Sequence, residues 1–138
     1  MGEHLVLDAC SIIAFIKNEA GSDVVSQQLS EATSGTVKLM LHKITLAEVV
    51  YDLMRSRLFN NPDEVFHAFA QLPIAISDAI TDDLIKSAAQ FKLKYKISFA
   101  DSFVLGFAQL HNATVLTSDH HEFGAIEKTG ALRFEWIR

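Results

Sequence analysis

Four acidic residues stand where expected strands pass into expected helices, and side chains of this type in these places can do metal-assisted chemistry. They are Asp8, Glu48, Asp101 and Asp119, in the contexts LVLDACSI, HKITLAEVV, SFADSFVLGFA and VLTSDHHEF. Because ligands bind outside the carboxyl ends of the strands in an open α/β sheet, we expect these carboxylates to converge. Two carboxylates about 5 Å apart repel by roughly 3 kcal/mol at an effective dielectric constant of about 20. A hard divalent cation with oxygen ligands would relieve that repulsion, and an open metal site indicates hydrolysis.

Alternating strands and helices are expected to position these acids. The apolar and β-branched runs predict strands over 4–7, 38–42, 74–76, 114–117 and 132–137. Helical periodicity and capping signals predict helices over 9–18, 22–33, 62–72, 81–95, 99–108 and 119–128, with an apolar helical stripe through 49–58. Ser22 is the expected N-cap of the second helix. This alternation predicts a parallel sheet with helices on both faces, in a single domain spanning 1–138.

Composition narrows the class of protein. The chain has 138 residues, 49% of them hydrophobic, and a formal net charge of −5. An acidic chain of this size is not a general basic nucleic-acid binder, so any RNA contact must come from a local patch. The single cysteine, Cys10, excludes an intrachain disulfide and suits a cytoplasmic setting. Neither a signal peptide nor an apolar run long enough for a membrane is expected.

Each acid also has a purely structural explanation. Capping boxes fit Thr45 with Glu48 and, as a variant, Ser98 with Asp101, while Asp8 and Asp119 are suitable N-caps. A shared site is favoured for the set, because one helix start needs one acid and four acids are expected at one edge. Asp101 in particular belongs to a helix rich in Phe and Ala, where its carboxylate is expected to lose water.

Three segments of the chain resemble a known family. LVLDACSIIAFI, ITLAEVVYDLM and ISFADSFVLGFAQLHNATVLTSDHHEF, in this order and spacing, are similar to PIN-domain ribonucleases, and especially to the VapC-type toxins of toxin–antitoxin pairs. The resemblance covers essentially the whole chain, and its last segment is the most specific. It implies a three-layer α/β/α sandwich with a central parallel sheet. It also implies an endoribonuclease that acts on RNA.

The resemblance assigns roles to individual residues. Asp8, Glu48, Asp101 and Asp119 would form the catalytic site and hold one or two Mg²⁺ or Mn²⁺ ions. Glu48 would bind through water or orient the nucleophile, and the other three would be direct ligands. Thr117 matches a hydroxyl that lies behind the last acid.

One position departs from the family pattern. The family often has Ser, Thr or Asn two residues after the first Asp, and this chain has Cys10 there. A thiol is a poor partner for a hard cation, so Ser11 is the expected substitute in the layer behind the metal ligands, or no residue takes that role.

The resemblance also implies partners: a cognate antitoxin and a second copy of the chain in a homodimer, both contacting helices between Leu46 and Leu72. The densest basic segment is Lys92, Lys94 and Lys96, which is either an RNA contact or a solvated helix end. Lys17, Lys43, Arg55 and Arg57 are further RNA candidates, and His120 and His121 are expected at the surface near Asp119.

Two other functions compete with the nuclease. One is a PIN-like RNA- or protein-binding module with a degenerate, inactive site. Cys10 argues for this interpretation, and the presence of all four acids argues against it. The other is phosphotransfer through Asp8. That chemistry needs a second Asp two residues later, where the chain has Cys10.

Overall fold

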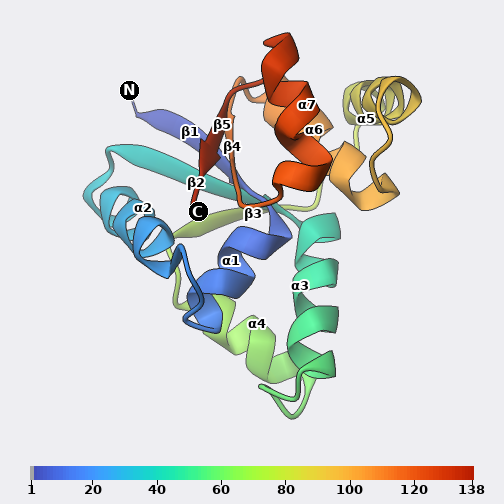
Figure 1. Cartoon of the computed structure of the whole chain (residues 1–138). Coiled ribbons are helices and arrows are strands. Elements are labelled where there is room, and N and C mark those ends of the chain that lie inside the picture. Colours follow the sequence, from blue (N-terminus) through green and yellow to red (C-terminus); the bar gives the residue numbers. More distant parts are fainter. Residues whose placement is uncertain (1) are drawn as a thin grey trace.

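A parallel sheet between two layers of helices organises the chain. The computed structural model describes residues 2–138 and has the three-layer α/β/α architecture predicted from the sequence (Figure 1). The strands are β1 (Glu3–Leu7), β2 (Val37–His42), β3 (Ile74–Ser77), β4 (Thr114–Thr117) and β5 (Phe134–Trp136). The helices are α1 (Ala9–Ile16), α2 (Ser22–Ser34), α3 (Lys43–Arg55), α4 (Pro62–Ala70), α5 (Asp82–Lys94), α6 (Phe99–Leu110) and α7 (His120–Thr129). No helix within 2–138 is both long and apolar enough to span a membrane.

The strand order determines where a ligand site can form. All strands are parallel and lie in the order β3-β2-β1-β4-β5, so β1 is central. The chain moves outward from β1 to β2 and β3, and then returns to the other side of β1 with β4. The boundary between β1 and β4 is therefore the switch point of the sheet, beside which open α/β folds bind their ligands.

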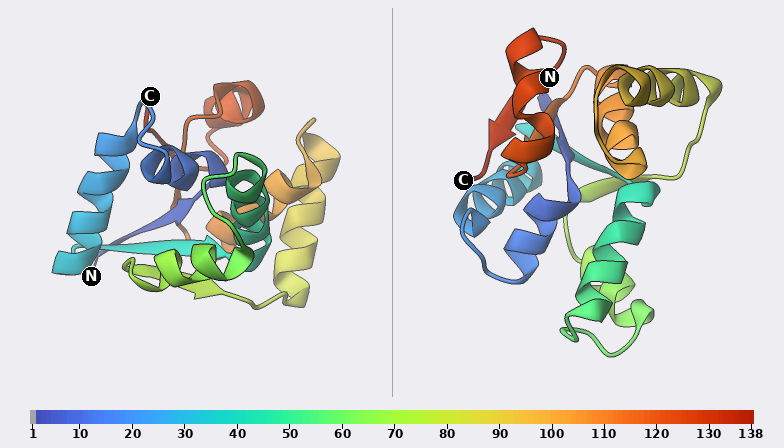
Figure 2. Two further views of the ribbon diagram at one scale, coloured as in Figure 1. Left: turned by 90° about the horizontal axis from the view of Figure 1, so that it is seen from below. Right: turned by 45° about the vertical axis from the view of Figure 1, so that its right-hand side comes forward.

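Alternate residues of the strands build a separate core on each face of the sheet. Leu5 and Leu7 of β1 pack with apolar residues of α1 to α4. Val6, which points to the opposite face, packs with apolar residues of α5, α6 and α7. Figures 1 and 2 show these two groups of helices on opposite sides of the sheet. The near-continuous apolar strands match a sheet that is covered on both faces.

Two local predictions are wrong. The N-cap of α2 is Gly21 rather than Ser22, because the chain enters the helix with a left-handed backbone (φ 94°) that favours glycine. The apolar stripe does not continue to Leu58, because α3 ends at Arg55 and leaves Leu58 half exposed.

Several helices begin at the edge of the sheet where β1 and β4 end. In Figures 1 and 2, the first turns of α1, α3, α6 and α7 gather beside this edge. Asp8 and Asp119 are the N-caps of α1 and α7, and Asp101 lies in the first turn of α6. Helix N-termini carry partial positive charge, so this edge favours anionic side chains.

Candidate active site

Asp8 is the most firmly held of the acids. It is only 3% exposed, and both of its carboxylate oxygens accept hydrogen bonds. Oδ1 accepts from the backbone N–H of Ala9 at 2.8 Å, and Oδ2 accepts from the hydroxyl of Thr117 at 2.8 Å. The Thr117 hydroxyl in turn accepts from the backbone N–H of Asp119 at 3.0 Å. Thr117 therefore connects the acid after β1 to the acid after β4, across the switch point.

The surroundings of Asp8 oppose its ionisation. Burial raises its pKa above the ordinary value, and the charge of Asp119 raises it further. The hydrogen bonds from Thr117, Cys10 and Ala9 act in the opposite direction, because they stabilise the ionised carboxylate. A buried carboxylate with this balance is a suitable ligand for a cation.

Asp101 experiences the negative charge of the whole site. It is 8% exposed, in agreement with the predicted loss of water, and burial is the main cause that raises its pKa to about 7. The charges of Asp8, Glu48 and Glu122 raise the pKa further, while a hydrogen bond from Ser98 lowers it. Asp101 therefore lies within electrostatic reach of Asp8, Glu48 and Glu122.

Glu48 does not have the structural role that a capping box would give it. Helix α3 begins earlier than that motif requires, and its N-cap is the buried His42, whose Nδ1 accepts from the N–H of Ile44 at 3.1 Å. Glu48 thus lies beyond the first turn and is exposed to solvent. Its pKa is raised by partial desolvation and then by the charge of Asp8. The capping-box explanation of Glu48 therefore does not hold, and its part in a shared site stays a prediction.

Glu122 is an acid of the site that sequence reasoning missed. Its backbone N–H donates to Asp119 Oδ1 at 3.0 Å, as expected at the start of a helix capped by Asp119. Its carboxylate Oε2, however, is buried and has no hydrogen-bond partner among residues 2–138. Its charge also reaches Asp101. The available signal was its place three residues after Asp119, which puts both acids in the first turn of one helix.

Cys10, rather than Ser11, contacts the Asp8 carboxylate. The Cys10 thiol donates to Asp8 Oδ2 at 3.2 Å and accepts from the backbone N–H of Ser118 at 3.3 Å. The Ser11 hydroxyl donates instead to the backbone carbonyl of Asp8 at 2.7 Å, so the role expected for Ser11 behind the metal ligands is not supported. Burial, and then the charge of Asp8, raise the pKa of Cys10 to about 11. The thiol therefore stays protonated and acts as a hydrogen-bond donor.

Comparison with known proteins identifies the family of this chain. The family described as "PIN domain" matches residues 5–128, which includes all of these acids. The chain belongs to the PIN domain family. A search of curated proteins found no match.

Solved structures with the same fold come from toxin–antitoxin systems. A toxin–antitoxin complex from Klebsiella pneumoniae superimposes on this PIN domain with a TM-score of 0.73 and 16% identity, covering 97% of this chain and 98% of the other. DNA-bound VapBC from Salmonella typhimurium gives 0.71 and 19%, covering 100% of both chains. VapBC2 from Rickettsia felis, bound to a promoter DNA fragment, gives 0.71 and 17%, covering 96% and 97%. At these identities the similarity establishes the fold.

Within 2–138, the acids of the candidate site form no ion pair: the ion pairs in that range join Asp52 to Lys17 and to Arg55. Among the described residues, no group of three His, Cys, Asp or Glu side chains is arranged to hold a metal ion. The donor type nevertheless suits a hard cation, since the site consists of carboxylates, and one oxygen, Glu122 Oε2, is buried without a hydrogen-bond partner.

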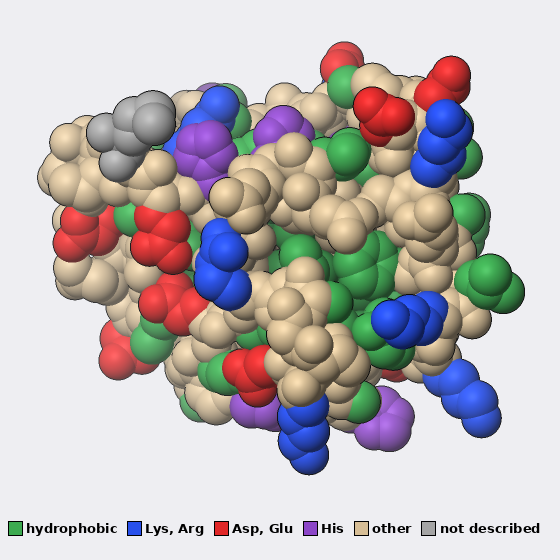
Figure 3. Space-filling view, turned by 90° about the horizontal axis from the view of Figure 1, so that it is seen from above, with side chains coloured by type: hydrophobic (Ala, Val, Ile, Leu, Met, Phe, Trp, Pro, Cys, Tyr) green, Lys and Arg blue, Asp and Glu red, His purple; other side chains and the backbone are tan. Residues whose placement is uncertain are grey.

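The three lysines of the predicted basic segment have different surroundings. Lys92 donates to the backbone carbonyl of Ile97 at 2.6 Å, which gives it a structural role at the end of α5. Lys94 lies 5.6 Å from the centre of the Tyr95 ring, and Lys96 is exposed. On the face in Figure 3, lysine and arginine side chains are scattered. The RNA contact predicted for Lys92, Lys94 and Lys96 stays a prediction.

Proposed function

We propose that this protein is a Mg²⁺- or Mn²⁺-dependent endoribonuclease and the toxin of a toxin–antitoxin pair. Members of the PIN family are generally nucleases, and the structural neighbours are toxin–antitoxin complexes. The observation that carries the proposal is the group of uncompensated carboxylates at the switch point of the sheet. A phosphodiester substrate would add more negative charge there. Binding of the substrate would therefore require a cation that neutralises part of this charge.

Each acid has a distinct part in the proposed site. Asp8, which is buried and fixed by Thr117, anchors the cation at the end of β1. Asp101 and Asp119 complete the binding face, with Glu122 behind them. Glu48 is exposed, so it can reach a water molecule or the substrate. When bound, the cation supplies a Lewis acid that lowers the pKa of water and neutralises charge on the phosphate.

The pKa of Asp101 makes the proposed cation binding pH-dependent. With a pKa of about 7, Asp101 is partly protonated near neutrality when no cation is bound. A cation must displace that proton, because only the ionised carboxylate is a good ligand. Cation affinity is therefore expected to rise as the pH increases through 7.

Cleavage of a mixed, structured RNA pool tests the proposed activity. Purified protein with Mg²⁺ or Mn²⁺ should cleave the pool, and both EDTA and Asp101→Asn should abolish cleavage. His121→Ala is the matched control, because His121 is exposed and should leave cleavage unchanged. Cleavage that survives Asp101→Asn would contradict the proposal, and absence of cleavage with either metal would favour a binding module with an inactive site.

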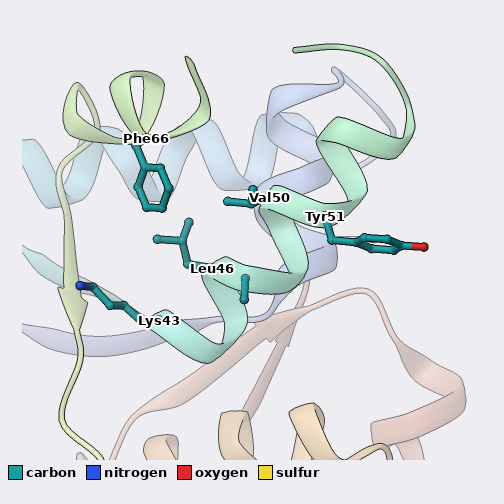
Figure 4. Close-up of a pocket in the computed structure, with 6 residues that line it drawn as sticks. Lys43, Leu46, Val50, Tyr51 and Phe66 are labelled. Carbon is teal, nitrogen blue, oxygen red and sulfur yellow. The ribbon is translucent and has the colours of Figure 1, made fainter. Parts of the chain in front are cut away.

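The proposed antitoxin has a suitable docking place beside Glu48. A groove of about 410 Å³ lies between α3 and α4, lined by Lys43, Leu46, Ala47, Val50, Tyr51 and Phe66. Figure 4 shows Phe66 of α4 facing Leu46 and Val50 of α3. Two large apolar side chains of this groove are open to solvent, Tyr51 at 68% and Phe66 at 49%, and contiguous apolar surface commonly marks a protein interaction site. Ala47 lines this groove and precedes Glu48, so a protein seated there would lie next to Glu48.

The docking place can be tested without knowing the RNA target. If the neighbouring reading frame encodes a small protein, co-expression should yield a complex that no longer cleaves RNA. Phe66→Asp should weaken this complex at least tenfold while RNA cleavage by the free protein continues. Unchanged affinity would show that the antitoxin binds to another surface of the protein. The same groove is a candidate contact of a homodimer. Sedimentation of the free protein and of its Phe66→Asp variant shows whether the groove joins two copies of the chain in the absence of the antitoxin.

A further inference from the structure

The C-terminal segment 136–138 is bound to the first turn of α7 through one side chain, His120. The imidazole ring of His120 stacks on the indole of Trp136, with ring centroids 3.9 Å apart and an interplanar angle of 15°. His120 Nε2 also lies 2.8 Å from the backbone carbonyl oxygen of Arg138. Because His120 directly follows Asp119, these two contacts act next to the candidate active site.

The segment that His120 contacts is itself well anchored. Trp136 Nε1 donates to Glu127 Oε2 at 2.8 Å, which fixes the indole near the other end of α7. The backbone N–H of Ile137 donates to the carbonyl of Thr117 at 3.0 Å, and Arg138 Nη1 donates to the carbonyl of Ala20 at 2.6 Å. Segment 136–138 is therefore attached to β4 and to the turn between α1 and α2, and it offers His120 a fixed surface.

The contact with Gly21 shows how closely this segment is packed. A Cβ at Gly21 would lie 2.8 Å from the carbonyl oxygen and from Cγ1 of Ile137, so only glycine leaves room for the chain there. The surface under His120 is thus held by the main body of the fold.

Helix α7 is anchored from its fourth residue onward. Phe123 is fully buried and stacks on Phe134 of β5, with ring centroids 5.6 Å apart. Before Phe123, none of the helix side chains is buried. The N-cap Asp119 and Glu122 are joined by the 3.0 Å bond from the Glu122 N–H to Asp119 Oδ1. Ahead of Phe123, the contacts of Thr117 with Asp119 and of His120 with segment 136–138 fix these acids relative to the sheet.

We propose that His120 is a positioning residue, which holds the first turn of α7 on segment 136–138 so that Asp119 and Glu122 face the other acids. His120 does not need to touch the substrate for this role, and its Nε2 is already engaged with Arg138. The consequence for cation affinity rests on the metal-dependent function proposed above. Supporting groups behind metal ligands commonly contribute about 10–100-fold in affinity.

Direct Mn²⁺ binding tests this role without relying on RNA cleavage. The dissociation constant is measured by the electron paramagnetic resonance signal of free Mn²⁺ on the whole protein. His120→Ala should raise the constant about tenfold, while His120→Phe, which keeps a ring over Trp136, should lie between Ala and wild type. His121→Ala should stay within twofold, since His121 is in the same turn but exposed. Wild-type affinity in His120→Ala would overturn the proposal.

A metal-free measurement separates this inference from the proposed function. In EDTA, hydrogen exchange of the amides of Glu122 and Phe123 should be at least tenfold faster in His120→Ala than in wild type, and unchanged in His121→Ala. If wild type binds no Mn²⁺ but exchange responds in this way, the metal function fails and the positioning role stands. If His120→Ala is too unstable for this comparison, His120→Phe is compared in its place. Unchanged exchange in the variant that is compared refutes the positioning role.

Discussion

At the scale of single residues, Asp101 contributes to the way in which the stability of the metal-free protein depends on pH. Its pKa is about 7 in the folded protein and near 3.8 in the unfolded chain. The folded state therefore binds the proton more tightly, so this contribution to stability is complete below pH 3.8 and is lost as the pH rises through 7. In EDTA, Asp101→Asn should exceed wild type in Tm by at least about 3 °C at pH 8, with a smaller gap at pH 5. Thermal unfolding at both pH values measures this, and a gap independent of pH would contradict the assigned pKa.

Thr117 is the residue on which the geometry between Asp8 and Asp119 depends. Its hydroxyl is fully buried, donates to Asp8 and accepts from the N–H of Asp119. Thr117→Val keeps the shape but removes the acceptor of the Asp119 N–H and leaves Asp8 Oδ2 with the weaker Cys10 thiol as its donor. It should cost about 1–3 kcal/mol in the free energy of unfolding. Urea unfolding measures the loss. Thr117→Ser retains the hydroxyl and should recover more than half of it, whereas equal losses in the two variants would indicate packing as the cause.

At the scale of elements, the position of α6, which carries Asp101, depends on close contact with α5. A Cβ at Gly106 would lie 2.9 Å from the backbone nitrogen of Ala88, and a backbone atom cannot move aside as a side chain can. Gly106→Ala should therefore destabilise the protein by about 1–3 kcal/mol despite the better helix propensity of alanine.

Gly124 in α7 provides the matched control. It also lies inside a helix, but a Cβ there would meet nothing within 4 Å. Gly124→Ala should stabilise the protein by about 0.5–1 kcal/mol through propensity alone. Chemical denaturation of both variants compares the two glycines. The same sign of change in both would show that the approach of α6 to α5 is less close than described.

Most elements could be predicted from the sequence because their signals are local. The strand 114–117 is β-branched and apolar, and Asn61 before Pro62 is a helix start, so both were found close to their observed bounds. The N-cap of α2 differs from the prediction at Gly21, where a Cβ would collide with Ile137, a residue far away in the sequence. Likewise His42 became the cap of α3 because its other ring nitrogen reaches the carbonyl of Ala79.

The candidate site could be predicted in outline for a different reason. Parallel strands bring residues after β1 and β4 together whatever the details of packing, so Asp8 and Asp119 could be associated in advance. The missed residue, Glu122, looked like an ordinary first-turn acid. Only the structure reveals that its Oε2 is buried without a partner. The contact of Cys10 with Asp8 also depends on side-chain directions that spacing does not supply.

At the scale of the whole molecule, cation binding should act as a source of stability, because folding brings carboxylates together that are far apart in the unfolded chain. At about a hundred times its dissociation constant, Mn²⁺ should add about 2.7 kcal/mol, or roughly 8 °C in Tm. NaCl of equal ionic strength should reproduce little of this, since screening does not replace ligand bonds. The increase should be larger at pH 8 than at pH 6, because Asp101 must lose its proton. It should nearly vanish in Asp101→Asn. Thermal unfolding in the presence of Mn²⁺, NaCl or EDTA measures these differences. Equal stabilisation by NaCl would show that the carboxylates only repel one another and do not bind a cation.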